Sequence, residues 1–285
     1  MAASPDATSR RPLALITGAS AGIGAAFARA YAARGYDLAL VARRGERLEA
    51  LSAELAAAHG TRSQVIVQDL AAFGAEGRVM DALGGHPVDV LVNNAGFSIA
   101  QDFAGVPWSR QRDFLMTLIV SACGLAYAVI PGMVARGRGA IINVASVAGF
   151  APGVAGHSLY PAAKSFAIKF TEALDAELGD KGIHVTALAP GSTESEFGEA
   201  NGTSALGRGA PSGLVQTADE VVRAAIEGNL AGKILVIPGW HNRLSVFLLR
   251  RLPHGLVRWA VRRGAQRFRL PPETGVGPGA GVKEA

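Results

Sequence analysis

Tyr160 and Lys164 are the two side chains in this sequence whose types and spacing most directly suggest acid–base chemistry. Four residues apart on a helix, they lie on one face and one turn from each other. A phenol, whose ordinary pKa is near ~10, is a poor acid or base at neutral pH. A neighbouring ammonium group stabilises the phenolate and lowers that pKa toward the working range. We therefore expect Tyr160 to exchange a proton with a substrate oxygen, and Lys164 to tune it.

A glycine-rich stretch, Thr17–Gly24, is suited to binding phosphate. It reads Thr-Gly-Ala-Ser-Ala-Gly-Ile-Gly, follows an apolar run and opens directly into an alanine-rich segment. Glycines permit a tight turn and the close approach of a pyrophosphate, whose charge is favoured at the N-terminus of the following helix. The spacing differs from the usual dinucleotide fingerprint, and the loop lacks the lysine of phosphate-hydrolysing loops. We expect a dinucleotide on Gly18, Gly22, Ile23 and Gly24; the alternative is a purely structural turn.

Two arginines, Arg43 and Arg44, end the second apolar run and indicate which dinucleotide binds. Enzymes that prefer NAD(H) place a carboxylate at this point to bind the ribose hydroxyls, and this run ends without one. Two guanidinium groups instead offer bidentate donors to a 2′-phosphate. The alternative, solvated arginines at a helix start, conflicts with the helix dipole, which disfavours cations at that end. The pattern predicts NADP(H) rather than NAD(H), with Ser20 as a second phosphate contact.

Seven short aliphatic runs alternate with helix-length segments. Their near-continuous apolarity is typical of parallel strands that are covered on both faces. The expected strands are Leu13–Ile16, Leu38–Val41, Val65–Val67, Val88–Val92, Ala140–Val144, Val185–Leu188 and Ile234–Ile237, and helical segments include Ala25–Arg34, Arg44–His59 and Ser165–Gly179. Seven strands joined by crossover helices predict the α/β class: a single doubly wound parallel seven-stranded sheet of Rossmann type with helices on both faces.

Four motifs in this order resemble the signature of the short-chain dehydrogenase/reductase family. They are Thr17–Gly24 after the first run, Asn93–Gly96 (Asn-Asn-Ala-Gly) after the fourth, Tyr160–Lys164 (Tyr-Pro-Ala-Ala-Lys), and Pro190-Gly191 after the sixth. The resemblance covers roughly residues 12–240. It implies reversible hydride transfer between C4 of a nicotinamide and a carbonyl or secondary alcohol carbon, with the sheet positioning donor, acceptor and proton source.

The resemblance also implies roles for further residues. Ser146, at the end of the fifth run, would hydrogen-bond the substrate oxygen beside Tyr160 and complete a catalytic set with Lys164. Asp69-Leu70, after the third run, resembles the family's adenine-ring contact. The other implied cofactor-binding residues are Asn94, Ala95, Gly96, Tyr160, Lys164 (through the nicotinamide ribose), Pro190, Gly191, Thr193 and Ser195. Ser195 stands where a threonine is common, and Thr193 competes with it to contact the carboxamide or a phosphate.

Leu118 departs from the family's pattern. Counting back thirteen residues from Pro131 reaches the position at which the family usually has an asparagine. In the family this position is thought to hold, largely through its backbone carbonyl, a water that links the lysine to solvent. Leu118 keeps such a carbonyl, so the departure bears on proton relay more than on hydride transfer. It also leaves open the alternative of a catalytically weakened protein that binds the nucleotide as a sensor.

Two segments beside the expected site have weaker signals. Residues 196–216 are rich in glycine, serine and alanine, which predicts a mobile lid over the substrate. His157 lies close to Tyr160 along the chain, and stabilisation of its loop is favoured over a catalytic role. No metal site is expected.

The chain has a 22-residue uncharged run, Phe114–Ala135, which hydropathy alone would assign to a membrane span. It contains Pro131 and two glycines, and a second uncharged run follows over 139–163. Two such runs in a glycine-rich chain with strand-like segments between them fit a buried α/β core better. We therefore expect this segment to be a core helix.

The C-terminal segment carries the basic character of the chain. Residues 229–272 hold nine of the 28 Lys and Arg and none of the 23 Asp and Glu, so the rest of the chain has an acidic excess. Residues 243–270 read as two short helices broken at Pro253, with eight arginines beside Leu244, Phe247, Leu248, Leu249 and Trp259. This pattern predicts peripheral contact with an anionic membrane or a lipid-like substrate. The alternative is an extension packed on the fold or across a subunit interface; nucleic acid is disfavoured because no interleaved stacking motif is present.

Composition and cysteine content set the remaining limits. With 285 residues, 49% hydrophobic and 18% charged, the chain is too apolar for a disordered protein and too poorly charged for a coiled coil. A lone cysteine, Cys123, forms no intramolecular disulfide, and the N-terminus, residues 1–12, has no apolar h-region behind Arg10–Arg11 that would indicate a secretory signal. A cytoplasmic location is therefore expected, peripheral at a membrane surface if the basic segment binds there.

These observations predict four regions and one function. The regions are a flexible N-terminus (1–11), a Rossmann-type catalytic domain (12–240), a basic amphipathic helical extension (241–272) and a disordered tail (273–285). The function expected is NADP(H)-dependent oxidoreduction of a small hydrophobic ketone or alcohol, derived from a lipid, steroid or acyl group, by a homo-oligomer (a dimer or tetramer).

Overall fold

The computed structural model describes residues 10–153, 155–194 and 214–265 of the chain. Ser195, nearly all of the predicted lid (196–216), the predicted disordered tail and almost all of the predicted flexible N-terminus lie outside the described residues. Arg10 and Arg11, the last two residues of that N-terminal segment, are held: Arg10 pairs with Asp89 at 2.9 Å, and the Arg11 Nε donates to the Gly35 carbonyl at 3.0 Å.

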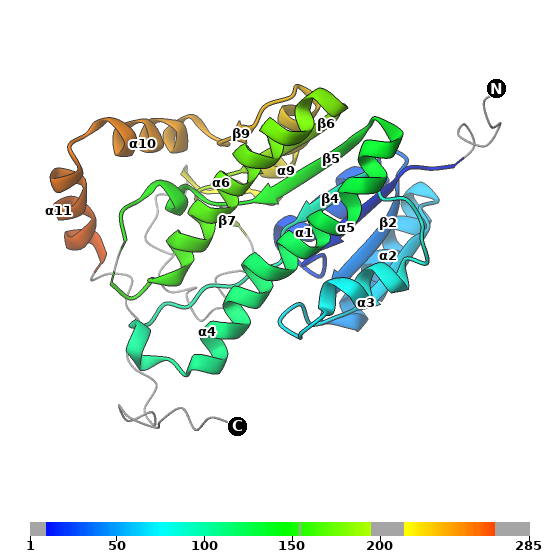
Figure 1. Cartoon of the computed structure of the whole chain (residues 1–285), viewed down its shortest axis with the longest axis horizontal. Helices are drawn as coiled ribbons and strands as arrows, with labels where there is room; N and C mark the ends of the chain where they lie inside the picture. The colour runs from blue at the N-terminus through cyan, green and yellow to red at the C-terminus, as the bar shows by residue number, and fades with distance from the viewer. Residues whose placement is uncertain (1–9, 154, 195–213, 266–285) are drawn as a thin grey trace.

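A seven-stranded parallel sheet forms the centre of the molecule (Figure 1). Its strands are β1 (Leu13–Thr17), β2 (Asp37–Ala42), β3 (Ser63–Val67), β4 (Val90–Asn93), β5 (Gly139–Val144), β6 (Ile183–Leu188) and β9 (Leu235–Val236), in the order β3-β2-β1-β4-β5-β6-β9. Each overlaps one of the seven predicted runs, and every pairing is parallel. The predicted doubly wound fold is confirmed.

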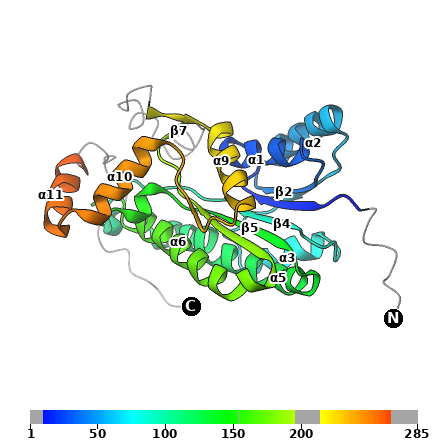
Figure 2. The same ribbon diagram turned by 90° about the horizontal axis from the view of Figure 1, so that it is seen from above.

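Helices cover both faces of this sheet (Figure 2). The helices are α1 (Gly22–Ala32), α2 (Gly45–His59), α3 (Ala75–Ala82), α4 (Trp108–Leu115), α5 (Ser121–Arg136), α6 (Leu159–Leu178), α9 (Ala218–Leu230), α10 (Trp240–Arg251) and α11 (His254–Ala265). One face carries α1, α2 and α9, and the other carries α3, α5 and α6.

Strand β2 explains why the sequence shows runs rather than alternation. Its side chains point alternately to the two faces, so Leu38 and Leu40 join the core beneath α1, while Ala39 and Val41 join the core beneath α3 and α5. All four are buried. A strand that is apolar at every position therefore fills two cores at once.

The uncharged run lies in a continuous helical segment, Trp108–Arg136, made of α4, a π-helical turn η2 (Met116–Val120) and α5. Within the described residues, this segment has the length of a membrane span and contains an 18-residue window with a mean hydropathy of 2.0. Leu125, Val129 and Met133 are nevertheless buried in the core between α5 and the sheet. One side of this segment therefore packs in the core, as predicted, whereas only 33% of its most apolar 18-residue window is buried.

The order of the strands fixes where a ligand can bind. The direction of winding reverses between β1 and β4, and a crevice forms outside the carboxyl ends of the strands at such a point. The glycine-rich loop follows β1, and Asn94 follows β4. Two very short strands, β7 (Thr193–Glu194) and β8 (Gln216–Thr217), pair near the same edge and were not predicted.

The C-terminal segment forms the two predicted helices, α10 and α11, separated at Leu252-Pro253. They lie at one end of the molecule, on the side toward which the arrowhead of β5 points (Figure 1). We refer to α10 and α11, residues 240–265, as the C-terminal arm.

Candidate active site

The loop between β1 and α1 is built to admit a phosphate. Gly18 has φ +67°, a conformation that favours glycine, and a Cβ on it would lie 2.8 Å from Asn94 Nδ2. A Cβ on Gly24 would meet the Gly18 carbonyl oxygen and lie 2.7 Å from the same Asn94 atom. The residue that precedes α1, Ala21, offers no side-chain hydrogen bond to the first amides of the helix. Those amides suit an anion, and the predicted dinucleotide fits this loop.

The same loop is tied to the end of β4. Asn94 Nδ2 donates to the carbonyls of Thr17 and Gly18 at 2.9 and 3.3 Å. Thr17 Oγ1 accepts from the backbone amides of Asn94 and Ala95 at 2.9 and 3.0 Å and donates to Val92. Sequence reasoning did not single out Thr17; its position as the last residue of β1 before the glycines is the signal that could have found it.

Arg43 and Arg44 lie exposed at the carboxyl end of β2. Arg44 reaches across to the glycine-rich loop, where its Nε and an Nη donate to Ser20 Oγ at 3.2 and 3.0 Å. Two of the three residues predicted to bind a 2′-phosphate, Ser20 and Arg44, are therefore in contact. Arg44 is also the N-cap residue of α2, and its guanidinium, which has only donors, makes no capping hydrogen bond there.

The remaining predicted contacts for the adenine side lie beyond β3. Asp69 is exposed, and its carboxylate accepts from the amide of Ala71 at 3.0 Å. Leu70 is buried, and its carbonyl accepts from Ser121 Oγ at 2.6 Å. Gly22, with φ +53°, opens α1, and Ile23 packs partly buried against the core. Of these four residues, Leu70 lines the same cavity as Thr17 of β1 and Asn93 of β4.

Ser146 and Tyr160 are brought together from two different elements. Ser146 follows β5 and precedes a 3-10 turn, η3 (Val147–Phe150), and its Oγ accepts from the Ala148 amide at 3.2 Å. Tyr160 is the second residue of α6. Burial raises the pKa of the Tyr160 hydroxyl, and a hydrogen bond with the Ser146 side chain opposes that rise. These two hydroxyl groups, at the carboxyl edge of the sheet, can both form hydrogen bonds with a substrate oxygen.

Lys164 lies one helical turn beyond Tyr160, as predicted, and is 8% exposed. Its Nζ donates to the Val144 carbonyl at 2.8 Å and lies 5.6 Å from the centre of the Tyr160 ring. Burial lowers the pKa of Lys164 to about 8. The sequence predicted that this ammonium lowers the pKa of Tyr160. The pKa is instead raised, because the effect of burial is the largest one.

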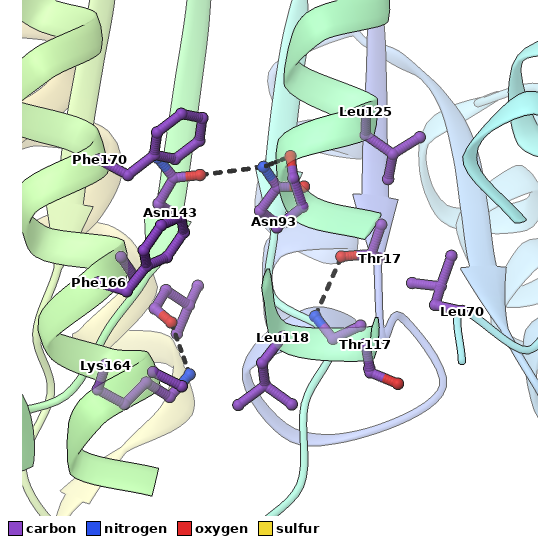
Figure 3. A pocket seen from close by; sticks show the side chains of 15 residues that line it. Thr17, Leu70, Asn93, Thr117, Leu118, Leu125, Asn143, Lys164, Phe166 and Phe170 are labelled. Carbon is purple, nitrogen blue, oxygen red and sulfur yellow. Dashed lines mark hydrogen bonds between the residues drawn. The ribbon is translucent and has the colours of Figure 1, made fainter. Parts of the chain in front are cut away.

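A cavity extends from Lys164 between α6 and the segment η2–α5 (Figure 3). Leu118, in the π-helical turn, lines it, and its Cγ packs 3.3 Å from where a Cβ on Gly96 would lie. Asn93 Nδ2 donates to Asn143 Oδ1 at 3.0 Å, whereas the buried Asn93 Oδ1 has no partner in the structure. Leu118 stands where the family usually has an asparagine, and its apolar side chain lines the same cavity as Lys164.

An apolar wall stands beside Tyr160. The Tyr160 ring packs partly buried against Leu118 and Phe114, and Phe114 holds the Phe97 ring edge-on at 5.5 Å. The other members of this wall are Ile99, Val106, Leu115, Ile119, Leu159 and Ala163. Phe114 is fully buried, so the carbon surface next to the phenol comes from the partly buried members of the wall, Phe97, Leu115, Ile119 and Leu159.

The loop after β6 closes the other side of the site. The Pro190 carbonyl accepts from the Val147 amide at 3.0 Å and lies 3.5 Å from Ser146 Oγ. Gly191 packs directly on Asn242 of α10, and Thr193 Oγ1 donates to the Gly191 carbonyl at 3.2 Å. Its expected competitor, Ser195, lies outside the described residues. His157 is half-buried in the loop before α6.

No cluster of three or more histidine, cysteine or acidic side chains that could hold a metal ion occurs among the residues described. What the arrangement offers is a phosphate loop, an arginine beside it, and a Ser–Tyr–Lys group next to carbon surface.

Comparison with known proteins places this arrangement in context. Residues 12–205 match the model of the short chain dehydrogenase family. An uncharacterized oxidoreductase of Myxococcus xanthus is 33% identical over 252 residues, which make up 88% of this chain and 96% of that protein. A very-long-chain 3-oxoacyl-CoA reductase of Anas platyrhynchos is 37% identical over 185 residues, 62% of this chain and 58% of that protein. The solved structure of a short-chain dehydrogenase from Sphingobium yanoikuyae in complex with NADPH has a TM-score of 0.76 at 35% identity, and the match covers 87% of this chain and 95% of that one.

Proposed function

The chain belongs to the short chain dehydrogenase family and is an oxidoreductase acting on CH–OH groups, and we propose that it interconverts a hydrophobic ketone and its secondary alcohol with NADP(H). The observation that carries this proposal is the convergence of Ser146, Tyr160 and Lys164 beside an apolar wall, next to a glycine loop to which Arg44 is bound.

The preference for NADP(H) rests on the Arg44–Ser20 contact. A guanidinium and a hydroxyl that already share a hydrogen bond can take a phosphate between them with little further ordering. Arg43 adds a second exposed cation at the same strand end. The solved NADPH complex of a relative at 35% identity supports the same choice.

The proposed roles follow from the geometry. A bound NADPH supplies a hydride to the carbonyl carbon. Tyr160 donates its hydroxyl proton to the carbonyl oxygen. Ser146 Oγ accepts from the Ala148 amide and donates weakly, at 3.5 Å, to the Pro190 carbonyl, and its proton would turn from that carbonyl to the substrate oxygen. With a pKa of about 8, Lys164 is mostly protonated at pH 7 and favours the phenolate that this transfer leaves. Solvent then restores the proton to Tyr160.

The proposed substrate class follows from the surface around the phenol. Phe97, Leu115, Ile119 and Leu159, which are only partly buried beside the phenol, offer carbon contacts and no charge. A ketone with bulky apolar substituents gains by burying them there, at roughly 25 cal/mol per Å². The very-long-chain 3-oxoacyl-CoA reductase named above has such a substrate in its printed name, and this chain spans a little over half of that protein's length.

A kinetic comparison of cofactors and substrates tests the proposal. Purified chain is mixed with NADPH or NADH and a panel of apolar and polar ketones, and nicotinamide oxidation is followed by absorbance. We expect turnover of the apolar ketones with kcat/KM at least about tenfold higher for NADPH. Arg44→Ser should remove most of that preference, whereas Arg34→Ser, an exposed arginine after α1, should leave it unchanged. Equal use of NADH by the unaltered chain would overturn the cofactor assignment.

A nucleotide-binding sensor is the second candidate, and Leu118 is the observation that favours it. An apolar side chain in the cavity next to Lys164 provides no amide to help hold a water there. Tight NADPH binding with no turnover on any ketone in the panel would select this reading over the enzyme.

We also propose a cytoplasmic homo-oligomer. Val120, Tyr127 and Phe166, on the helices η2, α5 and α6, are exposed by 43%, 82% and 36%, and Phe166 stacks on Phe170. Exposed apolar side chains of this kind on neighbouring helices suit a subunit contact. Light scattering after size exclusion should give the mass of a dimer or tetramer; a mass near 29.3 kDa would contradict it.

A further inference from the structure

The C-terminal arm exposes an apolar stripe that the fold does not cover. In α10 the side chains of Trp240, Leu244, Phe247 and Leu248 are exposed by 69%, 49%, 53% and 42%. Their spacing of i, i+4, i+7 and i+8 places them on one face of the helix. Leu252, Leu256 and Trp259, exposed by 42%, 49% and 54%, continue the apolar surface across the break into α11.

The opposite side of α10 is the one that packs on the fold. Val246 is 3% exposed, and Asn242 is 7% exposed with its Nδ2 donating to the Pro238 carbonyl at 2.8 Å. The helix therefore has two apolar sides, one satisfied by the protein and one left open. The core of the fold buries only one side of α10, so the exposed apolar residues on the other side indicate a binding partner.

Cations border this stripe, and acids are absent from the sequence around it. Arg243, Arg250, Arg251, Arg258 and Arg263 are all exposed, and residues 229–272 contain no Asp or Glu. Two of these arginines lie over aromatic rings: Arg251 is 5.3 Å from the centre of the Phe247 ring and Arg263 is 4.7 Å from that of Trp259. Aromatic rings with guanidinium groups beside them match the interface of an anionic bilayer, where rings enter the headgroup level and cations meet lipid phosphates.

We propose that the open face of the C-terminal arm docks on an anionic lipid surface. A second copy of this chain fits it less well, because a two-fold contact of the arm with itself would set arginines against arginines with no acid between them. A bilayer bearing negative lipids instead neutralises the cations and buries the rings together.

The arm is fixed to the loops that frame the active site. Gly191, in the loop after β6, packs on Asn242, and the Arg250 guanidinium lies 5.8 Å from the centre of the Phe150 ring in η3. Docking would therefore hold the carboxyl edge of the sheet near the bilayer, where apolar ketones concentrate. This consequence rests on the proposed function, whereas the docking itself does not.

Vesicle sedimentation tests the docking with the full chain. Vesicles of phosphatidylcholine alone and of phosphatidylcholine with phosphatidylserine are mixed with the protein at low and high salt. We expect binding to the anionic vesicles only, and its loss at high salt. The variant R251Q/R258Q/R263Q should bind roughly a hundredfold more weakly.

Two matched controls separate docking from loss of charge or of folding. The variant R34Q/R138Q/K181Q removes the same number of exposed cations, but each of them precedes a strand, at the amino edge of the sheet. This variant should bind vesicles like the unaltered chain. Phe247→Gln should weaken binding about tenfold or more, while Phe73→Gln, which removes a ring exposed by 92% on the loop after β3, should not.

Three results would overturn the docking. They are equal binding to both kinds of vesicle, equal losses in the arm and control triple variants, and no binding to either vesicle. Ketone turnover measured without vesicles is a separate readout. Its failure with vesicle binding intact would count against the proposed function and leave the docking standing.

Discussion

At Lys164 the fold buries an ammonium group against a backbone carbonyl. The Nζ donates to Val144, and the neighbouring phenol of Tyr160 is itself in a setting that raises its pKa. The spacing of the two residues predicted their shared helix face correctly. It could not predict the direction of the Tyr160 shift, because desolvation depends on what the rest of the chain packs around the pair.

Lys164 makes the stability of the protein depend on pH. Its pKa falls from 10.5 to about 8 on folding, so between these values the unfolded chain binds more protons than the folded chain. Stability should therefore rise with pH through this window. Relative to Lys164→Met, which has no such group, the unaltered chain should gain up to about 2 kcal/mol between pH 7 and pH 9.5.

Urea unfolding of both proteins at the two pH values measures this gain, and the comparison cancels the other titrating groups. Identical pH dependence of the two proteins would mean that Lys164 titrates normally in the folded chain.

Leu118 should limit activity at alkaline pH. An asparagine there would place a polar side chain in the cavity that Lys164 lines, favour the ammonium and raise its pKa. A rise of one unit from about 8 would increase the protonated fraction at pH 9 about fivefold. We therefore expect Leu118→Asn to raise kcat at pH 9 severalfold and to change it little at pH 6.

Leu118→Ala is the control, since it opens the same space without a polar group. Because Leu118 is buried in an apolar cluster, both variants should lose about 2–4 kcal/mol of stability. An equal change of kcat in both variants, or none in Leu118→Asn, would remove Leu118 from the account of proton relay.

Among the elements, the β1–α1 loop is the one in which the structure explains the glycines of the sequence most clearly. Its glycines were predicted to admit a phosphate, and the structure shows that Gly24 also lets α1 approach the Gly18 carbonyl and Asn94. Other local features were beyond prediction. The π-helical turn at Met116–Val120 and the two-residue strands β7 and β8 arise from tertiary contacts and have no periodicity of their own.

Gly24→Ala should damage both this element and its ligand site. The added methyl group would meet the Gly18 carbonyl oxygen, a backbone atom that cannot move without the loop. We expect a loss of about 1–3 kcal/mol in unfolding free energy and at least tenfold weaker NADPH binding, measured by fluorescence titration.

Gly77→Ala provides the matched change. Gly77 lies within α3 with nothing within 4 Å of an added Cβ, so the substitution should be neutral or stabilise by about 0.5–1 kcal/mol. If Gly24→Ala behaved like Gly77→Ala, the close approach of α1 to Gly18 would not matter for binding.

At the scale of the whole molecule, the sheet could be predicted from apolar runs that lie far apart along the chain. Seven apolar runs and the handedness of their connections predicted the sheet, because strands such as β2 fill both cores. The two helices of the C-terminal arm were also predicted, from Pro253 and the periodicity around it. The position of the arm was not predicted, because Asn242 and Gly191, which join it to the site, are 51 residues apart and neither carries a signal in the sequence.

The central claim is that Tyr160 and Lys164 serve hydride transfer from a bound NADPH to an apolar ketone. Mass spectrometry of the alcohol formed from NADPH that carries deuterium at both hydrogen positions of the nicotinamide C4 tests it most directly. With the unaltered chain we expect one deuterium on the carbinol carbon. With Tyr160→Phe we expect a rate about 10²–10⁴-fold lower, while NADPH binds as before. An alcohol without deuterium, or full activity of Tyr160→Phe, would contradict it.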